Sequence, residues 1–264
     1  MVDFNTVVEN YDAILLVLVR MSGLFILSPV FGRQNMPALF KVGFAFFLTL
    51  IYVSAAGNSL AVDYQDSIVL YVVFVMKELA VGIIMGYVTY IIMSGIYLAG
   101  QIIDNQIGFG YANVLDPITN IQVPLTSNFY YTYIILIFLL INGHHMIIRA
   151  LFYSYEVISL GQLTFSSDVI SELGGLMADM FGIALRLAAP IIAAIFIADV
   201  VLGVLSKTIP EMNVFMLGMP IKVFLGLIVI TITISNAEPI AEGLTSLMEE
   251  NIIKFFTAMG TGGT

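Results

Sequence analysis

The sequence predicts an all-α membrane protein built from about six long, partly broken hydrophobic helices. Hydrophobic residues make up 60% of the 264 residues and charged residues only 10%, and the mean hydropathy is +1.02. A soluble protein of this size would carry many more charges on its surface. The chain has room for several apolar tracts of about 20 residues, the length that crosses a bilayer as a helix.

The first three apolar tracts cover about 13–31, 42–56 and 68–98. The first is interrupted by Arg20, and we expect it to stay in the mature protein because no basic residue precedes Arg20 as a signal peptide would require. The second tract is uncharged. The third is too long for one upright span, so it must tilt, bend or extend outside the bilayer.

The fourth tract, about 129–148, contains the run Asn-Gly-His-His at 142–145, which predicts a polar break that neighbouring helices satisfy. A polar connector at 154–175 leads to the fifth tract, about 176–205. Pro190 lies within the fifth tract, and because proline removes a backbone hydrogen bond we expect a bend there.

The sixth tract, about 223–235, is followed by an amphipathic segment at 243–259. Its polar side carries Glu250 and Lys254 at i, i+4 spacing. Its apolar residues recur at helical spacing and predict a helix for an interface or a partner: Leu244, Met248, Ile252, Phe255, Phe256 and Met259.

Basic residues concentrate in the loops after the first and fifth tracts, at Arg33, Lys41, Lys207 and Lys222. These loops share one side of the membrane if six spans alternate, and the positive-inside rule then places the N-terminus outside. Only nine residues are Lys or Arg, some of them within the tracts, so the orientation stays open.

The segment 100–124 interrupts the apolar pattern with three glycines, two prolines and two aspartates. The Asp-Pro dipeptide at 116–117 excludes a regular helix, and Gly108 and Gly110 allow positive φ angles. Irregular backbone beside membrane-length helices is tolerated where protein buries it or where it lines a watery cavity. The pattern leaves open a loop in or over a passage and an ordinary exposed connector.

Charged residues also lie within or at the edge of the tracts, where each costs about 3 kcal/mol at mid-membrane. One interpretation is that these residues form a path for ions or protons. The other, which we favour, is that they form structural ion pairs and assembly contacts, because buried charges are usually paired. The six residues are Arg20, Lys77, Glu78, Asp179, Arg186 and Asp199.

Several classes of function lack the residues that they need. The net charge of −9 argues against a nucleic-acid partner, and the chain has no cysteine. Adjacent histidines at 144 and 145 do not address one metal ion from a regular helix, so we expect no metal site. No nucleophile–base pair, Walker loop or dinucleotide motif is present, so we expect neither an enzyme nor a cofactor.

Motifs between residues 20 and 222 are more specific than any of these patterns. They include Arg-Met-Ser-Gly-Leu-Phe at 20–25, Lys-Glu-Leu at 77–79, Ala-Gly-Gln-Ile-Ile-Asp at 99–104, Asn-Gly-His-His at 142–145 and Pro-Glu-Met-Asn-Val-Phe at 210–215. In this order they resemble the FliR/SctT family, which belongs to the export gate of flagellar and injectisome type III secretion. The 142–145 motif favours the flagellar branch. Glu211 departs from the family, which usually has Gln at this position, and adds a charge to the second basic loop.

The resemblance implies a single copy of this chain closing a helical, chiral pore together with several copies of FliP and FliQ. Residues 1–172 would correspond to a FliP-like four-helix region, and residues 173–264 to a FliQ-like two-helix hairpin with the amphipathic helix. Further expected partners are FlhB, FlhA and unfolded flagellar export substrates. The expected location is the flagellar basal body at the bacterial inner membrane, with the complex projecting towards the periplasm.

The plug loop of the family maps onto residues 108–124. The implied plug residues are Gly108, Phe109, Gly110, Tyr111, Val114, Leu115, Asp116, Pro117 and Pro124. The implied buried-charge assembly contacts are Arg20, Lys77, Glu78, Asp104, Arg186 and Asp199.

An alternative function is a stand-alone secondary transporter. The interrupted tracts and the two loops that combine basic residues with proline support it, because transporters often contain repeats with broken helices. The two halves of the sequence show no convincing symmetry, which argues against it. Transport by the isolated chain favours this alternative, and obligate assembly favours the export gate.

Overall fold

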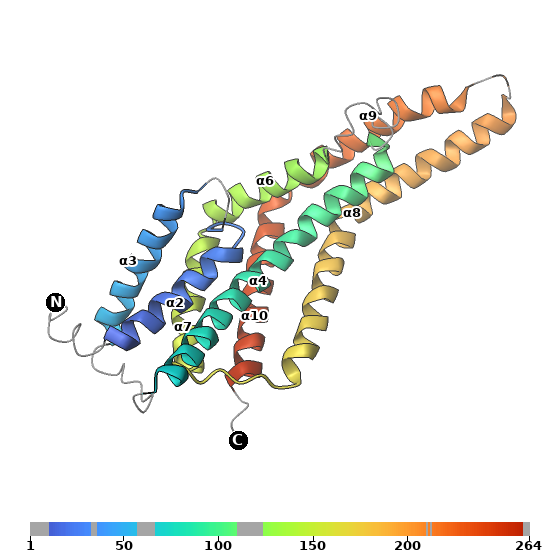
Figure 1. Cartoon of the computed structure of the whole chain (residues 1–264). Helices are drawn as coiled ribbons and strands as arrows, with labels where there is room; N and C mark the ends of the chain where they lie inside the picture. Colours follow the sequence, from blue (N-terminus) through green and yellow to red (C-terminus); the bar gives the residue numbers. More distant parts are fainter. Residues whose placement is uncertain are drawn as a thin grey trace, which may run out of the picture. The chain divides into compact units, whose positions relative to one another are not determined.

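The computed structural model describes residues 11–32, 36–56, 67–109, 124–209, 211 and 213–260. In these ranges the chain forms α-helices and no strand, which confirms the predicted fold class (Figure 1). The helices are α2 (Tyr11–Leu27), α3 (Ala38–Ala56), α4 (Ile68–Ile107), α6 (Leu125–Leu140), α7 (Gly143–Val157), α8 (Asp168–Thr208), α9 (Val214–Ile234) and α10 (Ala237–Gly260).

Four of the described helices, α3, α4, α8 and α9, are long and apolar enough to cross a membrane. The interrupted pair α6 and α7 adds a fifth candidate span if the two are counted as one. At about 1.5 Å per residue the 40 residues of α4 extend well beyond a hydrocarbon core of about 30 Å. This helix therefore tilts strongly or continues outside the bilayer.

The break predicted in the fourth tract is confirmed, but the predicted satisfaction of its polar groups by neighbouring helices is not, because the buried Nδ1 atom of His144 has no hydrogen-bond partner among the described residues. Helix α6 ends at Leu140, and α7 begins at Gly143. Asn142 lies between them with a φ of 60°, in the left-handed region that asparagine tolerates better than most residues.

The fifth and sixth tracts begin earlier than predicted. Helix α8 starts at Asp168, so it includes the paired glycines 174 and 175 that suggested a connector, because a glycine costs a helix only about 1 kcal/mol. Figure 1 shows that α8, which contains Pro190, changes direction part-way along its length.

The second basic loop is also shorter than predicted. Asn213 caps α9 by accepting a hydrogen bond from the Met216 amide at 3.2 Å, so the helix begins at Val214. Lys222 was expected in the loop and instead lies inside α9, after Pro220. Lys41 and Lys207 likewise lie in the end turns of helices α3 and α8.

The chain divides into two compact units. One consists of residues 1–91, 142–176 and 245–264, and the other of residues 92–141 and 177–244, each as far as the structure describes it. Both units are therefore discontinuous in sequence. The resemblance implies a different division into two continuous regions, residues 1–172 and 173–264, which stays a prediction.

Helices α2 and α4 make backbone contact in the first unit. A Cβ atom on Gly23 would lie 2.9 Å from the Leu79 carbonyl oxygen, and one on Gly82 would lie 2.9 Å from the Gly23 Cα. Gly86, four residues further on, also lies close to α2, with a Cβ 3.0 Å from the Leu24 carbonyl oxygen. Small residues at this spacing let membrane helices approach closely.

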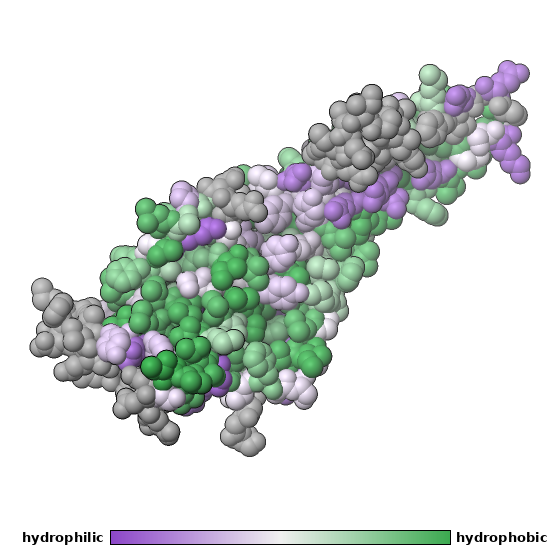
Figure 2. All heavy atoms as spheres, viewed as in Figure 1, coloured by the Kyte–Doolittle hydropathy of each residue, from purple (hydrophilic) through white to green (hydrophobic). Residues whose placement is uncertain are grey.

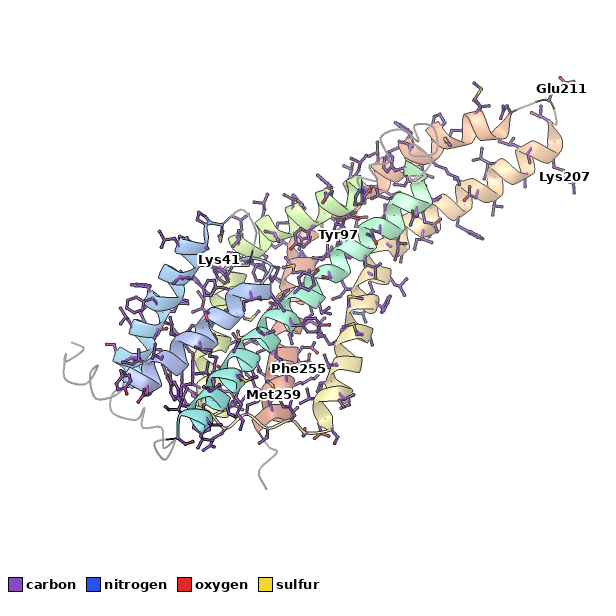
Figure 3. All side chains as sticks on the ribbon, in the orientation of Figure 1. Lys41, Tyr97, Lys207, Glu211, Phe255 and Met259 are labelled. Carbon is purple, nitrogen blue, oxygen red and sulfur yellow. The ribbon has the colours of Figure 1, made fainter. Side chains whose placement is uncertain are left out.

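The α8–α9 hairpin of the second unit exposes many large apolar side chains and also carries the Asp199–Lys222 ion pair. Figure 2 shows hydrophilic side chains gathered at its tip, where Lys207 and Glu211 are labelled in Figure 3. Between the helices lies an apolar groove of about 350 Å³, lined by Ala194, Ile197, Ala198, Val201, Leu202, Leu205, Ile221 and Leu225.

The amphipathic character predicted for 243–259 is confirmed in α10, but its apolar face packs within this chain and is not left free for an interface or a partner, as was predicted. All six of the apolar residues predicted to share a face are buried, and Phe255 and Met259 mark this face in Figure 3. Glu250 and Lys254 form the expected ion pair at 2.8 Å on the exposed side.

Candidate functional site: a buried ion pair and the base of the 108–124 segment

Arg20 and Glu78 form a buried ion pair in the first unit. The Arg20 Nε donates to Glu78 Oε2 at 2.6 Å, and an Arg20 terminal nitrogen donates to Glu78 Oε1 at 3.1 Å. The side chains are 0% and 1% exposed. Two parallel bonds between a guanidinium and a carboxylate are a strong and directional arrangement. The pair lies one turn from the contact between Gly23 and Gly82.

The remaining donors of Arg20 are bound by the end of α7. One terminal nitrogen donates to the Ser154 hydroxyl at 3.1 Å, and the other also donates to the Ile158 carbonyl oxygen at 3.0 Å. The Arg20 guanidinium carbon lies 4.1 Å from the centre of the Tyr155 ring, whose hydroxyl donates to the Val17 carbonyl oxygen at 3.1 Å. Arg20 thus joins three helices, α2, α4 and α7.

Gly161 completes the network through its backbone. Its amide donates to Glu78 Oε1 at 2.8 Å, and its carbonyl accepts from Lys77 Nζ at 3.2 Å. Lys77 and Glu78 point in different directions on α4 yet meet the same residue. Gly161 has a φ of 76°, and a Cβ there would lie 2.8 Å from the Phe74 ring, so only glycine fits this turn.

Both charged side chains of the pair make several hydrogen bonds to other parts of the first unit. The network therefore holds helices α2, α4 and α7 together. For Arg20 and Glu78 the geometry favours the structural interpretation over an ion path. The role of these residues in assembly with other subunits stays a prediction.

Asp104 lies in the second unit, near the end of α4, and is 7% exposed. Its carboxylate oxygens accept a shared hydrogen bond from the Thr126 amide at 3.0 and 3.2 Å. Thr126 is in the first turn of α6, where amides have no partner within the helix. Asp104 therefore caps α6 from a different helix.

Gly100 brings the same two helices together one turn earlier on α4. A Cβ there would lie 2.8 Å from the Ser127 hydroxyl oxygen and closer still to the Ser127 backbone. Gly108, with a φ of 97°, ends α4. The two helix ends that bound the 108–124 segment are therefore held next to each other.

Most of the predicted plug residues lie outside the described residues. Of the set, Gly108, Phe109 and Pro124 are described. Those outside are Gly110, Tyr111, Val114, Leu115, Asp116 and Pro117, and Arg33 of the first basic loop is outside as well.

The other predicted charges occupy more accessible positions in this chain. Asp199 and Lys222 form an ion pair that joins α8 to α9, with side chains 45% and 25% exposed. Arg186 and Lys207 are exposed, and Lys41 donates to the Gly32 carbonyl oxygen at 2.9 Å. Of the predicted assembly contacts, Arg20, Glu78 and Asp104 are buried within this chain, and contacts of the others with further subunits stay a prediction.

Replacing Lys222 by alanine is expected to lower the free energy of unfolding of the chain by less than about 1 kcal/mol, the range for ion pairs that are not buried, because both side chains of the pair are partly exposed in this chain. The thermal unfolding temperature in detergent checks this, with Lys254→Ala in the more exposed pair of α10 as the control. A clearly larger drop in unfolding temperature for Lys222→Ala than for Lys254→Ala would contradict this expectation.

Sequence reasoning missed the backbone and hydroxyl partners of this site. Ser154, Thr126 and Gly161 carry no motif that marks them as partners of a charge. The spacing of Gly82 and Gly86 is a small-xxx-small signal from which the close approach of α2 and α4 could have been predicted. His144 and His145 lie with ring centres 4.2 Å apart, and among the described residues no group of three potential ligands could hold a metal ion.

Comparison with known proteins gives a consistent result. The model of the family described as bacterial export proteins, family 1, matches residues 11–248. The chain is 32% identical to the flagellar biosynthetic protein FliR of Bacillus subtilis (strain 168) over 259 residues, covering 97% of this chain and 99% of that protein. It is 30% identical to the Yop proteins translocation protein T of Yersinia pestis over 212 residues, covering 78% of this chain and 80% of that protein. It is 29% identical to the surface presentation of antigens protein SpaR of Shigella flexneri over 193 residues, covering 72% of this chain and 74% of that protein.

Proposed function

The chain belongs to the bacterial export proteins, family 1, and from this membership we propose that it is a structural and gating subunit of the flagellar type III protein export gate. The membership makes it an integral inner-membrane component of an export apparatus of the flagellar or type III secretion kind. The assignment to the flagellar gate rests on one observation, the similarity to a FliR over nearly the whole of both chains.

The proposed partners are FliP and FliQ in a common pore, with FlhB and FlhA nearby in the basal body. The exposed surface of α8 and α9 carries many large apolar side chains, including Phe196, Val200, Val204, Leu217 and Phe224, and is compatible with contact to further subunits. Contiguous apolar surface of this kind is covered by lipid or by other subunits. The substrates are unfolded flagellar proteins, which pass the inner membrane through the pore towards the periplasm.

The proposed gating element is the 108–124 segment. A conduit wide enough for an unfolded chain leaks ions unless it is filled. Phe109, Tyr111, Val114 and Leu115 would fill the closed lumen by apolar packing. Such contacts are non-directional and weak individually, so a substrate can displace them. The proposal gains support from the hydrogen bond between Asp104 and Thr126, which joins the end of α4 to the start of α6 on either side of the segment.

Shortening the segment between Gly110 and Pro124 is expected to raise the leakage of small solutes through the assembled complex, because less apolar side-chain volume remains to fill the lumen. Release of a trapped dye from liposomes containing the complex measures this. Removing the same number of residues from 57–66 serves as the control. Unchanged permeability of an intact complex carrying the shortened segment would count against the gating role.

A further inference from the structure

Helix α3 packs against the rest of the first unit along a single stripe. Figure 1 shows it beside α2 at the edge of this unit. The Phe44 ring centre lies 5.7 Å from that of Phe25 in α2, and the Tyr52 ring centre lies 4.3 Å from that of Tyr155 in α7. The buried residues of the helix follow the same stripe: Ala45, Leu48, Thr49 and Val53. The chain itself leaves the other sides of α3 uncovered.

The uncovered surface of α3 is apolar over its central turns. Its outer face, as we call it, consists of six large side chains that are 37–84% exposed: Leu39, Val42, Phe46, Phe47, Leu50 and Ile51. Lys41 is the only charged residue of the helix; it lies in the first turn and donates to the Gly32 carbonyl oxygen at 2.9 Å. Thr49 is buried and donates to the Ala45 carbonyl oxygen at 2.8 Å. A surface without charges or free polar groups is complementary to hydrocarbon, in which such groups are costly.

The size of these side chains distinguishes lipid from another helix. Where α2 and α4 meet in this chain, they approach through glycines at 23, 82 and 86, and small residues are typical of helix contacts in membranes. The outer face of α3 carries large side chains instead. Gly43 is the only glycine of α3, and four residues to either side of it are Leu39 and Phe47, so no small-xxx-small pattern forms.

The length of α3 also matches a bilayer. Its apolar stretch Ala38–Ala55 has 18 residues, which as a helix is about 27 Å long, close to a hydrocarbon core of about 30 Å. The apolar helices α4 and α8, with 40 and 41 residues, exceed this length. The surface of α8 and α9 carries the partly exposed pair Asp199–Lys222.

We infer that α3 crosses the hydrocarbon core of the bilayer and that its outer face contacts lipid acyl chains and no other subunit. Membership of the family places the chain in the membrane without indicating which of its surfaces meets lipid. The inference is independent of any gating role of the 108–124 segment.

Site-directed spin labelling tests this in the complete complex. The chain has no cysteine, so Phe47→Cys gives it a single labelling site in the middle of the outer face. The complex is purified with its co-expressed partner subunits, labelled with a nitroxide and reconstituted into liposomes. The wild-type complex, treated in the same way, measures any labelling of the partners. Collisions of the nitroxide with oxygen, which concentrates in hydrocarbon, are then compared with its collisions with a water-soluble nickel chelate.

The ratio of oxygen to nickel collisions is expected to be several-fold higher for Phe47→Cys than for Glu249→Cys, an exposed position on α10. Labels at Leu39→Cys and Ser54→Cys, near the two ends of α3, should give intermediate ratios because they lie closer to the lipid headgroups. Equal ratios at all three α3 positions would overturn the inference that the helix crosses the bilayer.

The contact with lipid has its own contrary results. An immobile label at Phe47→Cys that meets neither reagent lies against another subunit, and a label that meets the nickel chelate lies in water; either result overturns the inference. Loss of the complex, judged by its native mass, would do the same, because lipid imposes no shape on a side chain. Phe47→Leu keeps the apolar surface and is expected to leave the native mass and the unfolding temperature of the complex unchanged. A lower mass for this variant would show that Phe47 packs against a subunit.

Discussion

Replacing Arg20 by alanine is expected to destabilise the protein by about 3–5 kcal/mol, the range seen when one partner of a buried ion pair is removed. The variant leaves the Glu78 carboxylate without its counter-ion in a site that is 1% exposed. It also removes the donors to Ser154 and Ile158 that join α7 to α2. The expected result is loss of most of the chain from the membrane fraction, measured together with the unfolding temperature in detergent of what remains.

Three further variants make this expectation specific. Arg20→Lys keeps the charge but lacks the planar guanidinium that makes two parallel hydrogen bonds. Its unfolding temperature should therefore lie between those of the wild type and Arg20→Ala. Arg20→Met together with Glu78→Gln should be more stable than Arg20→Met alone, because no buried charge is left unpaired. Lys254→Ala, in a pair whose side chains are 44% and 59% exposed, is the control. Equal unfolding temperatures for Arg20→Ala and Lys254→Ala would contradict a supporting role for the buried pair.

Replacing Gly82 by alanine is the second change with a large expected effect. The added methyl group would meet the backbone of α2 at Arg20 and Gly23, and backbone atoms cannot rotate away as a flexible side chain can. Overpacking in a well-packed core costs about 1–3 kcal/mol. We expect the upper end of this range, because separating α2 from α4 also weakens the Arg20–Glu78 pair one turn away.

The matched control is Gly43→Ala in α3, where a Cβ meets no atom within 4 Å. This variant should be neutral or more stable by up to about 1 kcal/mol, because alanine is the better helix former. Unfolding temperatures of both variants in the same detergent measure the difference. Equal stability of the two would show that the close approach of α2 and α4 is not needed.

The stretches of the chain that form helices could largely be predicted from the sequence, but the residues at which these helices begin and end could not. The apolar face of α10 was predicted correctly because the helical period is a local property. The start of α9 was misplaced because Pro220 and Lys222 look like loop residues, whereas the Asn213 side chain begins the helix earlier.

The candidate site was predicted only in its charged members. Arg20 and Glu78 were identifiable because a charge within an apolar tract is costly and must have a reason, whereas Asp104 was predicted only through the resemblance to the family. Nothing in the neighbouring sequence identifies their partners Ser154, Gly161 and Thr126, because these residue types are common and belong to no motif for binding a charge.

Hydrophobicity, helical period and motif order are carried by neighbouring residues, so they were enough to predict a helical, membrane-embedded member of an export family. The pairing of Arg20 with Glu78, 58 residues away, and the capping of α6 by Asp104, across 22 residues, became visible only in the folded chain. Helical phase gives the face on which a side chain lies, but not the helix that this face meets. That choice depends on where backbones approach closely, at Gly23, Gly82 and Gly100, and therefore on the packing of the whole chain.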